Sequence, residues 1–133
     1  MKTDDQLMAE LRAAAEGLLF MSETDHPLAV VRWEGAQVVT PEFLRREAGK
    51  GADAPVEEVS AEQVFRAATS EPGWKGEEEL RTARRFQALV RLLADNLEGL
   101  TAYRVGEIDV AVYVVGRSGE GGWLGVTTRA VET

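Results

Sequence analysis

The last third of the chain restricts its fold more than any other part. Between Tyr103 and Val131, the pattern changes to a period of two in three runs that are rich in strand-forming residues. The runs are Tyr103–Val105, Ile108–Val115 and Trp123–Val131. Such alternation places apolar side chains on one face of a strand. Because the glycine-rich segment 116–122 joins the last two runs, we expect three successive strands in an antiparallel meander.

A long helix is predicted directly before this meander. Apolar residues recur at helical spacing from Gly76 to about Glu98, and Gly99 is the expected stop. Acidic residues fill the first turn and arginines follow, which suits the helix dipole. Helices followed by an antiparallel sheet are typical of an α+β domain.

The first half of the chain predicts shorter elements. We expect helices from Thr3 or Asp4 to Gly17 or shortly beyond, from Thr40-Pro41 to about Ala48, and from Ser60 through Ala68, and strands at Leu28–Trp33 and Val56–Val59. Together these elements predict an α/β (α+β) fold, layered α/β/α with a mostly antiparallel sheet. At 133 residues we expect one domain, spanning 1–133.

Charge and composition exclude several classes of protein. The 15 basic and 23 acidic residues give a net charge of −8, which disfavours direct nucleic-acid binding because that binding depends on lysine and arginine. The absence of cysteine excludes disulfides and thiolate metal sites. The polar start of the chain does not resemble a signal peptide, and no run is long enough for a membrane span. We therefore expect a soluble, cytoplasmic protein.

Catalytic motifs are weak. His26 is the only histidine, so a multi-histidine metal site is excluded. A small hydrolase could in principle use Glu23, Glu107 or Asp109 with His26, although no nucleophile, base and orienting group can be identified. Glu107 and Asp109 should share a solvent-facing side of their strand, opposite an Ile108 that fills the core. We expect neither an enzyme nor a bound cofactor.

Two features suggest a binding surface instead. Trp74 lies in a loop rich in proline and glycine, and tryptophan is frequent among the residues that dominate protein interfaces. The chain ends on Thr133, which carries a hydroxyl and a carboxylate close together. Such oxygen atoms are ligands that magnesium prefers. From composition alone, a core position for Trp74 and a frayed terminus are the alternatives.

Six short segments, taken together and in this order, resemble the nuclease A inhibitor family. They are Leu18-Leu-Phe-Met-Ser-Glu23, Trp33-Glu-Gly35, Asp53-Ala-Pro55, Tyr103-Arg-Val-Gly-Glu107, Val112-Tyr-Val-Val-Gly116 and Val131-Glu-Thr133. The resemblance extends over almost the whole chain. It implies an α/β/α sandwich similar in fold to plant pathogenesis-related proteins of class 1.

The resemblance also implies a function and a set of site residues. Family members inhibit a sugar-non-specific, magnesium-dependent ββα-metal endonuclease by plugging its cleft. The implied partner-binding residues are Glu23, Trp74, Glu132 and Thr133, and Thr133 would approach the partner's magnesium. We therefore expect a protein partner, bound one to one, and a monomer when free. An acidic plug suits a cleft built for phosphates.

One position departs from the family pattern. Gly73 precedes Trp74, where the family has an acidic residue. This departure leaves a second hypothesis open, in which the chain is a binding module of the same fold with a different protein partner.

Overall fold

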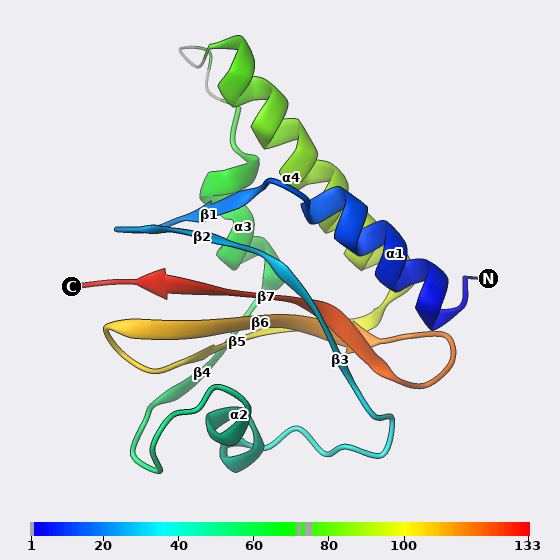
Figure 1. The fold of residues 1–133 in the computed structure, drawn as a ribbon, viewed down its shortest axis with the longest axis vertical. Coiled ribbons are helices and arrows are strands. Elements are labelled where there is room, and N and C mark those ends of the chain that lie inside the picture. Colours follow the sequence, from blue (N-terminus) through cyan, green and yellow to red (C-terminus); the bar gives the residue numbers. More distant parts are fainter. Residues whose placement is uncertain (1, 72, 74–75) are drawn as a thin grey trace.

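A computed structural model describes residues 2–71, 73 and 76–133 (Figure 1). In chain order, the elements are α1 (Asp4–Ala15), β1 (Leu19–Met21), β2 (Asp25–Pro27), β3 (Ala29–Trp33), α2 (Pro41–Glu47), β4 (Val56–Val59), α3 (Ala61–Thr69), α4 (Glu77–Asn96), β5 (Glu98–Val105), β6 (Asp109–Arg117) and β7 (Trp123–Val131). The predicted α+β class is confirmed.

The alternating C-terminal runs form the middle of a five-stranded sheet. The strand order is β3-β7-β6-β5-β4, and every neighbouring pair is antiparallel. The meander β5-β6-β7 therefore exists as the alternation predicted. β1 and β2 form a separate two-stranded sheet.

Side-chain caps begin three of the helices where the sequence predicted them. The hydroxyls of Thr3, Thr40 and Ser60 each accept a hydrogen bond from a backbone N–H three residues later. At the other end of α1, Arg85 of α4 donates to the carbonyl oxygens of Ala14, at 3.1 Å, and Glu16, at 2.6 Å. One of the arginines of α4 thus satisfies carbonyl groups that a helix end leaves unpaired.

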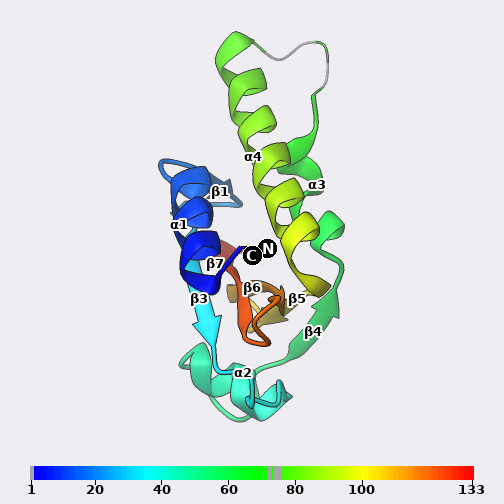
Figure 2. The ribbon, with the colours of Figure 1, turned by 90° about the vertical axis from the view of Figure 1, so that its right-hand side faces the viewer.

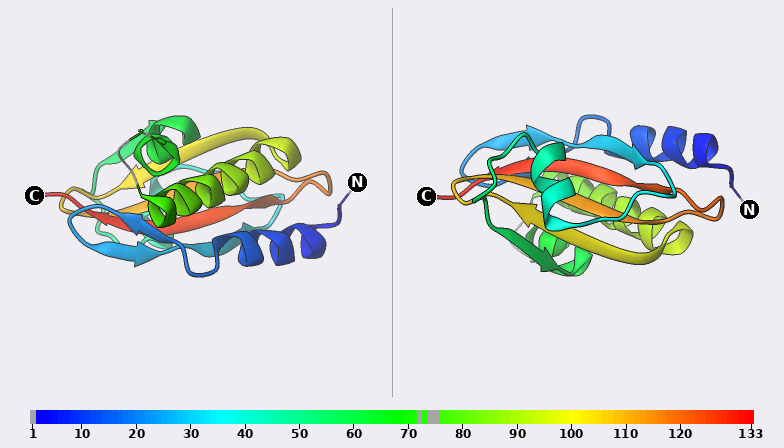
Figure 3. Two further views of the ribbon diagram at one scale, coloured as in Figure 1. Left: turned by 90° about the horizontal axis from the view of Figure 1, so that it is seen from above. Right: turned by 90° about the horizontal axis from the view of Figure 1, so that it is seen from below.

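Helices cover both faces of the sheet. Figures 1 and 2 show α1, α3 and α4 on one face and α2 on the other, and Figure 3 shows α4 crossing the strands. Leu11, Phe65 and Leu89 are buried in the larger core between the sheet and the three helices. Under α2, the Trp33 ring centroid lies 4.8 Å from that of Phe43. The likeness to pathogenesis-related proteins of class 1 stays a prediction.

Two local predictions were wrong, and one element was missed. Leu18 and Leu19 continue the apolar spacing of α1, but the helix ends at Ala15 and Gly17 has a φ of 77°. Leu19 then starts a hairpin that the sequence did not predict. Ile108 lies in a turn and is 61% exposed, so it does not fill the core.

None of the helices in the described part of the chain combines the length and apolar character that crossing a membrane requires.

Candidate functional site

The end of the chain is held on both sides by hydrogen bonds from backbone N–H groups. On one side, Glu23 N donates to Val131 O at 3.2 Å, and Val131 N donates to the Ser22 hydroxyl at 2.9 Å. On the other side, Glu132 N donates to Ile108 O at 2.9 Å. The terminal segment, defined as Val131–Thr133, thus lies between the β1–β2 turn and the β5–β6 turn (Figure 1).

Glu23 and Thr133 bind each other directly. The Thr133 hydroxyl donates to Glu23 Oε1 at 2.6 Å, and the Thr133 backbone N–H donates to Glu23 Oε2. Because its proton is directed at Glu23, the hydroxyl oxygen keeps its lone pairs for another ligand. Two predicted site residues that are 110 positions apart are therefore brought together.

Glu132 lies beside them, but its carboxylate is bound within the chain. Glu132 Oε1 accepts a hydrogen bond from Arg104 of β5. The same guanidinium lies 3.4 Å from Glu57 Oε1 of β4. Arg104 therefore joins the terminal segment to the far edge of the sheet.

A hollow of about 430 Å³ opens at the terminal segment. It is lined by Phe20, Met21, Ser22, Glu23, Arg104, Ala130, Val131, Glu132 and Thr133. One of the lining side chains, Met21, is apolar and 75% exposed. Ile108, whose carbonyl accepts from Glu132 N, is also exposed. Exposed apolar groups beside carboxylates are typical of protein-binding surfaces.

An ion cluster fixes the turn that carries Ile108. Asp109 hydrogen-bonds to Arg129 and lies 3.3 Å from Lys50 Nζ, which also donates to Asp109 O at 2.6 Å. The hydrogen bond from Arg129 is the main reason that the pKa of Asp109 lies below its ordinary value, and Lys50 adds to this effect while partial burial opposes it. Both cations thereby favour the charged form of Asp109.

The structure does not assemble a hydrolase site from the carboxylates considered above. His26 Nδ1 lies 3.2 Å from the Thr24 hydroxyl, and no hydrogen bond joins His26 to a carboxylate of a described residue. Glu23 binds Thr133, and Asp109 binds Arg129. Within residues 2–71, 73 and 76–133, no three histidine or acidic side chains are grouped to hold a metal ion.

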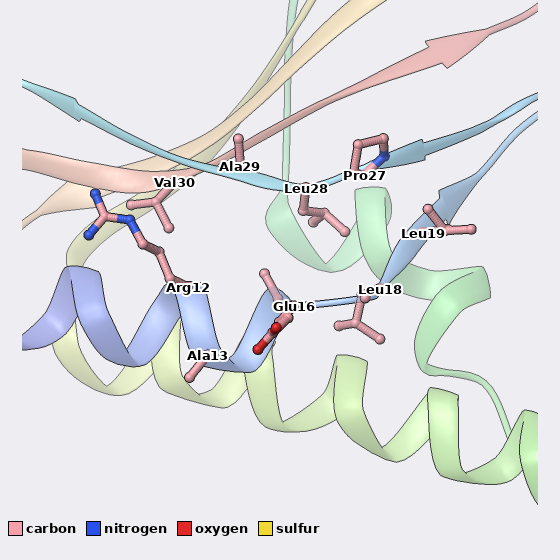
Figure 4. A pocket seen from close by; sticks show the side chains of 11 residues that line it. Arg12, Ala13, Glu16, Leu18, Leu19, Pro27, Leu28, Ala29 and Val30 are labelled. Carbon is pink, nitrogen blue, oxygen red and sulfur yellow. The ribbon is translucent and has the colours of Figure 1, made fainter.

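A second hollow, of about 580 Å³, lies between the end of α1 and the strands β1 to β3 (Figure 4). The side chains that Figure 4 labels there are mostly apolar, and Arg12 and Glu16 are the charged ones. Glu16 is the only carboxylate in the lining of this pocket, and the lining has no histidine, serine, threonine or lysine, so it does not pair a nucleophile with a base.

Trp74 lies outside the described residues, so its predicted contact with a partner stays a prediction. Two residues that the sequence analysis did not single out do contribute to the site. Ser22 precedes Glu23, and Arg104 lies in the segment Tyr103–Glu107, so both belong to the segments that carry the family resemblance. Their place in those segments was the one sequence signal that could have identified them as site residues.

Comparison with known proteins identifies one family. The family model described as NuiA, nuclease A inhibitor-like protein, matches residues 5–133. No individual curated protein matches the chain. The family predicted from the six segments is confirmed over nearly the whole chain.

Proposed function

We propose a function that proceeds from one fact: the chain belongs to the nuclease A inhibitor-like family. This family implies a nuclease inhibitor, and its partner is then a nuclease. The proposal is that the chain binds one molecule of a sugar-non-specific, magnesium-dependent ββα-metal endonuclease. It would block the active-site cleft with its terminal segment and carry out no catalysis itself.

The observation that supports this mechanism is the contact between Glu23 and Thr133. A terminal segment held in one conformation loses little conformational entropy when it enters a cleft. Magnesium prefers oxygen ligands and usually keeps several waters. The Thr133 hydroxyl oxygen and the terminal carboxylate could replace such waters, while Glu23 holds the hydroxyl proton away from the metal.

Electrostatics favours the same partner. A cleft that binds a polyanion is basic, and a net charge of −8 steers the inhibitor towards it. Glu23 and Glu132 lie at the proposed contact, where they add negative charge beside the terminal carboxylate. Trp74, together with the exposed Met21, would supply the apolar part of the interface.

The direct test is inhibition of a ββα-metal nuclease acting on DNA in the presence of magnesium. Deleting Thr133, or extending the chain beyond it, should weaken inhibition strongly. Thr133→Val removes the hydroxyl at nearly constant shape and should also weaken inhibition, whereas Thr133→Ser should keep most of it. Melting temperatures of all four variants should stay close to that of the original chain.

Unchanged inhibition by both the deleted and the extended chain would refute the terminal plug. Equal inhibition by Thr133→Val and Thr133→Ser would refute a role for the hydroxyl while leaving the carboxylate as the candidate ligand.

Gly73 supports a second candidate, a binding module with another protein partner. Affinity purification from native lysate separates the two candidates, because the first predicts recovery of a nuclease and the second predicts recovery of other proteins only. We propose a cytoplasmic location, where an inhibitor would guard the cell against a nuclease destined for export.

A further inference from the structure

Arg104 connects two parts of the sheet that are not neighbours. Its backbone pairs with Val112 of β6, which in turn pairs with Thr128 of β7. Arg104 therefore lies two strands away from β7, yet its guanidinium binds Glu132, beyond the end of that strand. The side chain is 27% exposed, so it is largely sheltered from solvent.

The guanidinium is held from both sides. Glu57 of β4 approaches it to 3.4 Å, and Glu132 accepts its hydrogen bond. A planar guanidinium has N–H groups in fixed directions, so it can bind two carboxylates in a defined geometry. A lysine ammonium fixes that geometry less well. The ion pair with Glu57 on the neighbouring strand β4 thus helps to hold the Arg104 guanidinium in place.

Glu132 is the only residue between the last strand and Thr133. Its backbone N–H is bound by Ile108 O, and its side chain is bound by Arg104. With both groups held, the direction in which the chain continues to Thr133 is restricted. Thr133 is then directed towards Glu23, to which both its N–H and its hydroxyl donate.

We propose that Arg104 is a positioning residue for inhibition, acting through Glu132 on the orientation of Thr133. This inference rests on the proposed function for its inhibitory consequence. It also reassigns Glu132, whose carboxylate serves mainly to hold the terminal segment and only secondarily to contact the partner.

The test is a double-mutant cycle of Arg104→Gln and Glu132→Gln, measured by the inhibition constant on a ββα-metal nuclease. Each single variant should weaken inhibition about tenfold, and the double variant should also lose about tenfold, because both remove the same interaction. Arg104→Lys should retain part of the inhibition because it keeps the charge.

A second readout uses the free protein. Amide hydrogen exchange of Thr133 should be several-fold faster in both single variants, because its N–H leaves Glu23 more often. Arg32→Gln is the matched control. Arg32 also lies near two carboxylates, those of Asp4 and Asp5, but these belong to the start of α1, so its loss should leave inhibition and Thr133 exchange unchanged.

The outcomes separate the explanations. A hundredfold loss in the double variant would mean that Arg104 and Glu132 act on inhibition independently of each other, which overturns the positioning role. Unchanged exchange at Thr133, or faster exchange with unchanged inhibition, also overturns it. If the original chain inhibits no nuclease, the proposed function fails, and the exchange measurement alone then decides whether Arg104 holds the terminal segment.

Discussion

The Ser22 hydroxyl joins the β1–β2 turn to the last residue of β7. It accepts a hydrogen bond from Val131 N at 2.9 Å and donates to Thr24 O at 2.9 Å. One side chain thus fixes both the turn that carries Glu23 and the strand that leads to Thr133. The relative position of the two site residues depends on it.

Replacing Ser22 by alanine should therefore weaken inhibition as well as stability. The variant leaves Val131 N–H without its acceptor, which costs about 1 kcal/mol at the site. Inhibition of the nuclease should weaken about fivefold, and amide exchange at Val131 should become faster.

Ser60→Ala is the control for that measurement. Its hydroxyl caps α3 by accepting from Gln63 N at 3.0 Å, far in sequence from the terminal segment. Its loss should lower the free energy of unfolding by about 1 kcal/mol and leave inhibition unchanged. Equal inhibition by the Ser22→Ala and Ser60→Ala variants would contradict the role given to Ser22.

Gly125 is required by the packing of the sheet. A Cβ atom at this position of β7 would lie 1.8 Å from Val114 O, a backbone atom of the neighbouring strand β6. Gly125→Ala must therefore displace a central strand, and we expect a loss of about 3 kcal/mol or more in the free energy of unfolding. Denaturation by urea measures this loss.

Gly51→Ala provides the comparison, because a Cβ atom there meets no other atom within 4 Å. Its free energy of unfolding should stay within about 0.5 kcal/mol of the original. Equal free energies of unfolding for the Gly125→Ala and Gly51→Ala variants would contradict the close approach of β6 and β7.

Local sequence signals predicted most elements because each signal acts within a few residues. Hydroxyl caps fixed three helix starts, and two runs rich in strand-forming residues, joined by a glycine-rich segment, identified β6 and β7. The β1–β2 hairpin could not be predicted in this way. Leu18 and Leu19 fit the helical stripe of α1, and the pairing of Phe20 with His26 depends on how the hairpin packs in the folded protein.

Residue chemistry indicated Thr133, but the contact that forms the site was not predictable from local patterns. Glu23 and Thr133 meet across 110 positions, and no local pattern relates them. The resemblance named both residues but not their contact. It also named Glu132 without its partner Arg104. The Arg104 side chain contacts Glu132 across β6, and the order of residues in the sequence does not indicate such a contact.

Asp109 should make stability depend on pH in the acid range. Arg129 is the main cause of a folded-state pKa below the ordinary value of 3.8. A depressed pKa means that the stabilisation is fully present above the unfolded-state value and is lost as the pH falls through the folded-state value. The difference in unfolding free energy between the original chain and Asp109→Asn should therefore shrink below about pH 4.

Urea denaturation at a series of pH values measures that difference. Asp53→Asn is a suitable control because Asp53 is an exposed carboxylate without an ion pair among the described residues. A difference for Asp109→Asn that stays constant down to pH 2 would show that its ion pairs do not stabilise the fold.

Association with the nuclease should slow as salt is added. The inhibitor carries a net charge of −8, and attraction to a basic cleft is screened over about 10 Å at 0.1 M salt. Between roughly 50 and 500 mM NaCl, we expect the association rate constant to fall about tenfold, while the dissociation rate constant changes much less. Stopped-flow measurement gives both constants.

The position of the charge should matter as well as its amount. Glu107 lies in the turn beside the terminal segment, whereas Glu10 lies on α1, the helix that begins on the side of the molecule opposite the C-terminus (Figure 1). Glu107→Gln and Glu10→Gln remove the same charge, so a difference between them reports where the cleft binds. We expect the larger fall in association rate for Glu107→Gln, because electrostatic attraction weakens with distance. Equal effects would place the contact elsewhere on the surface.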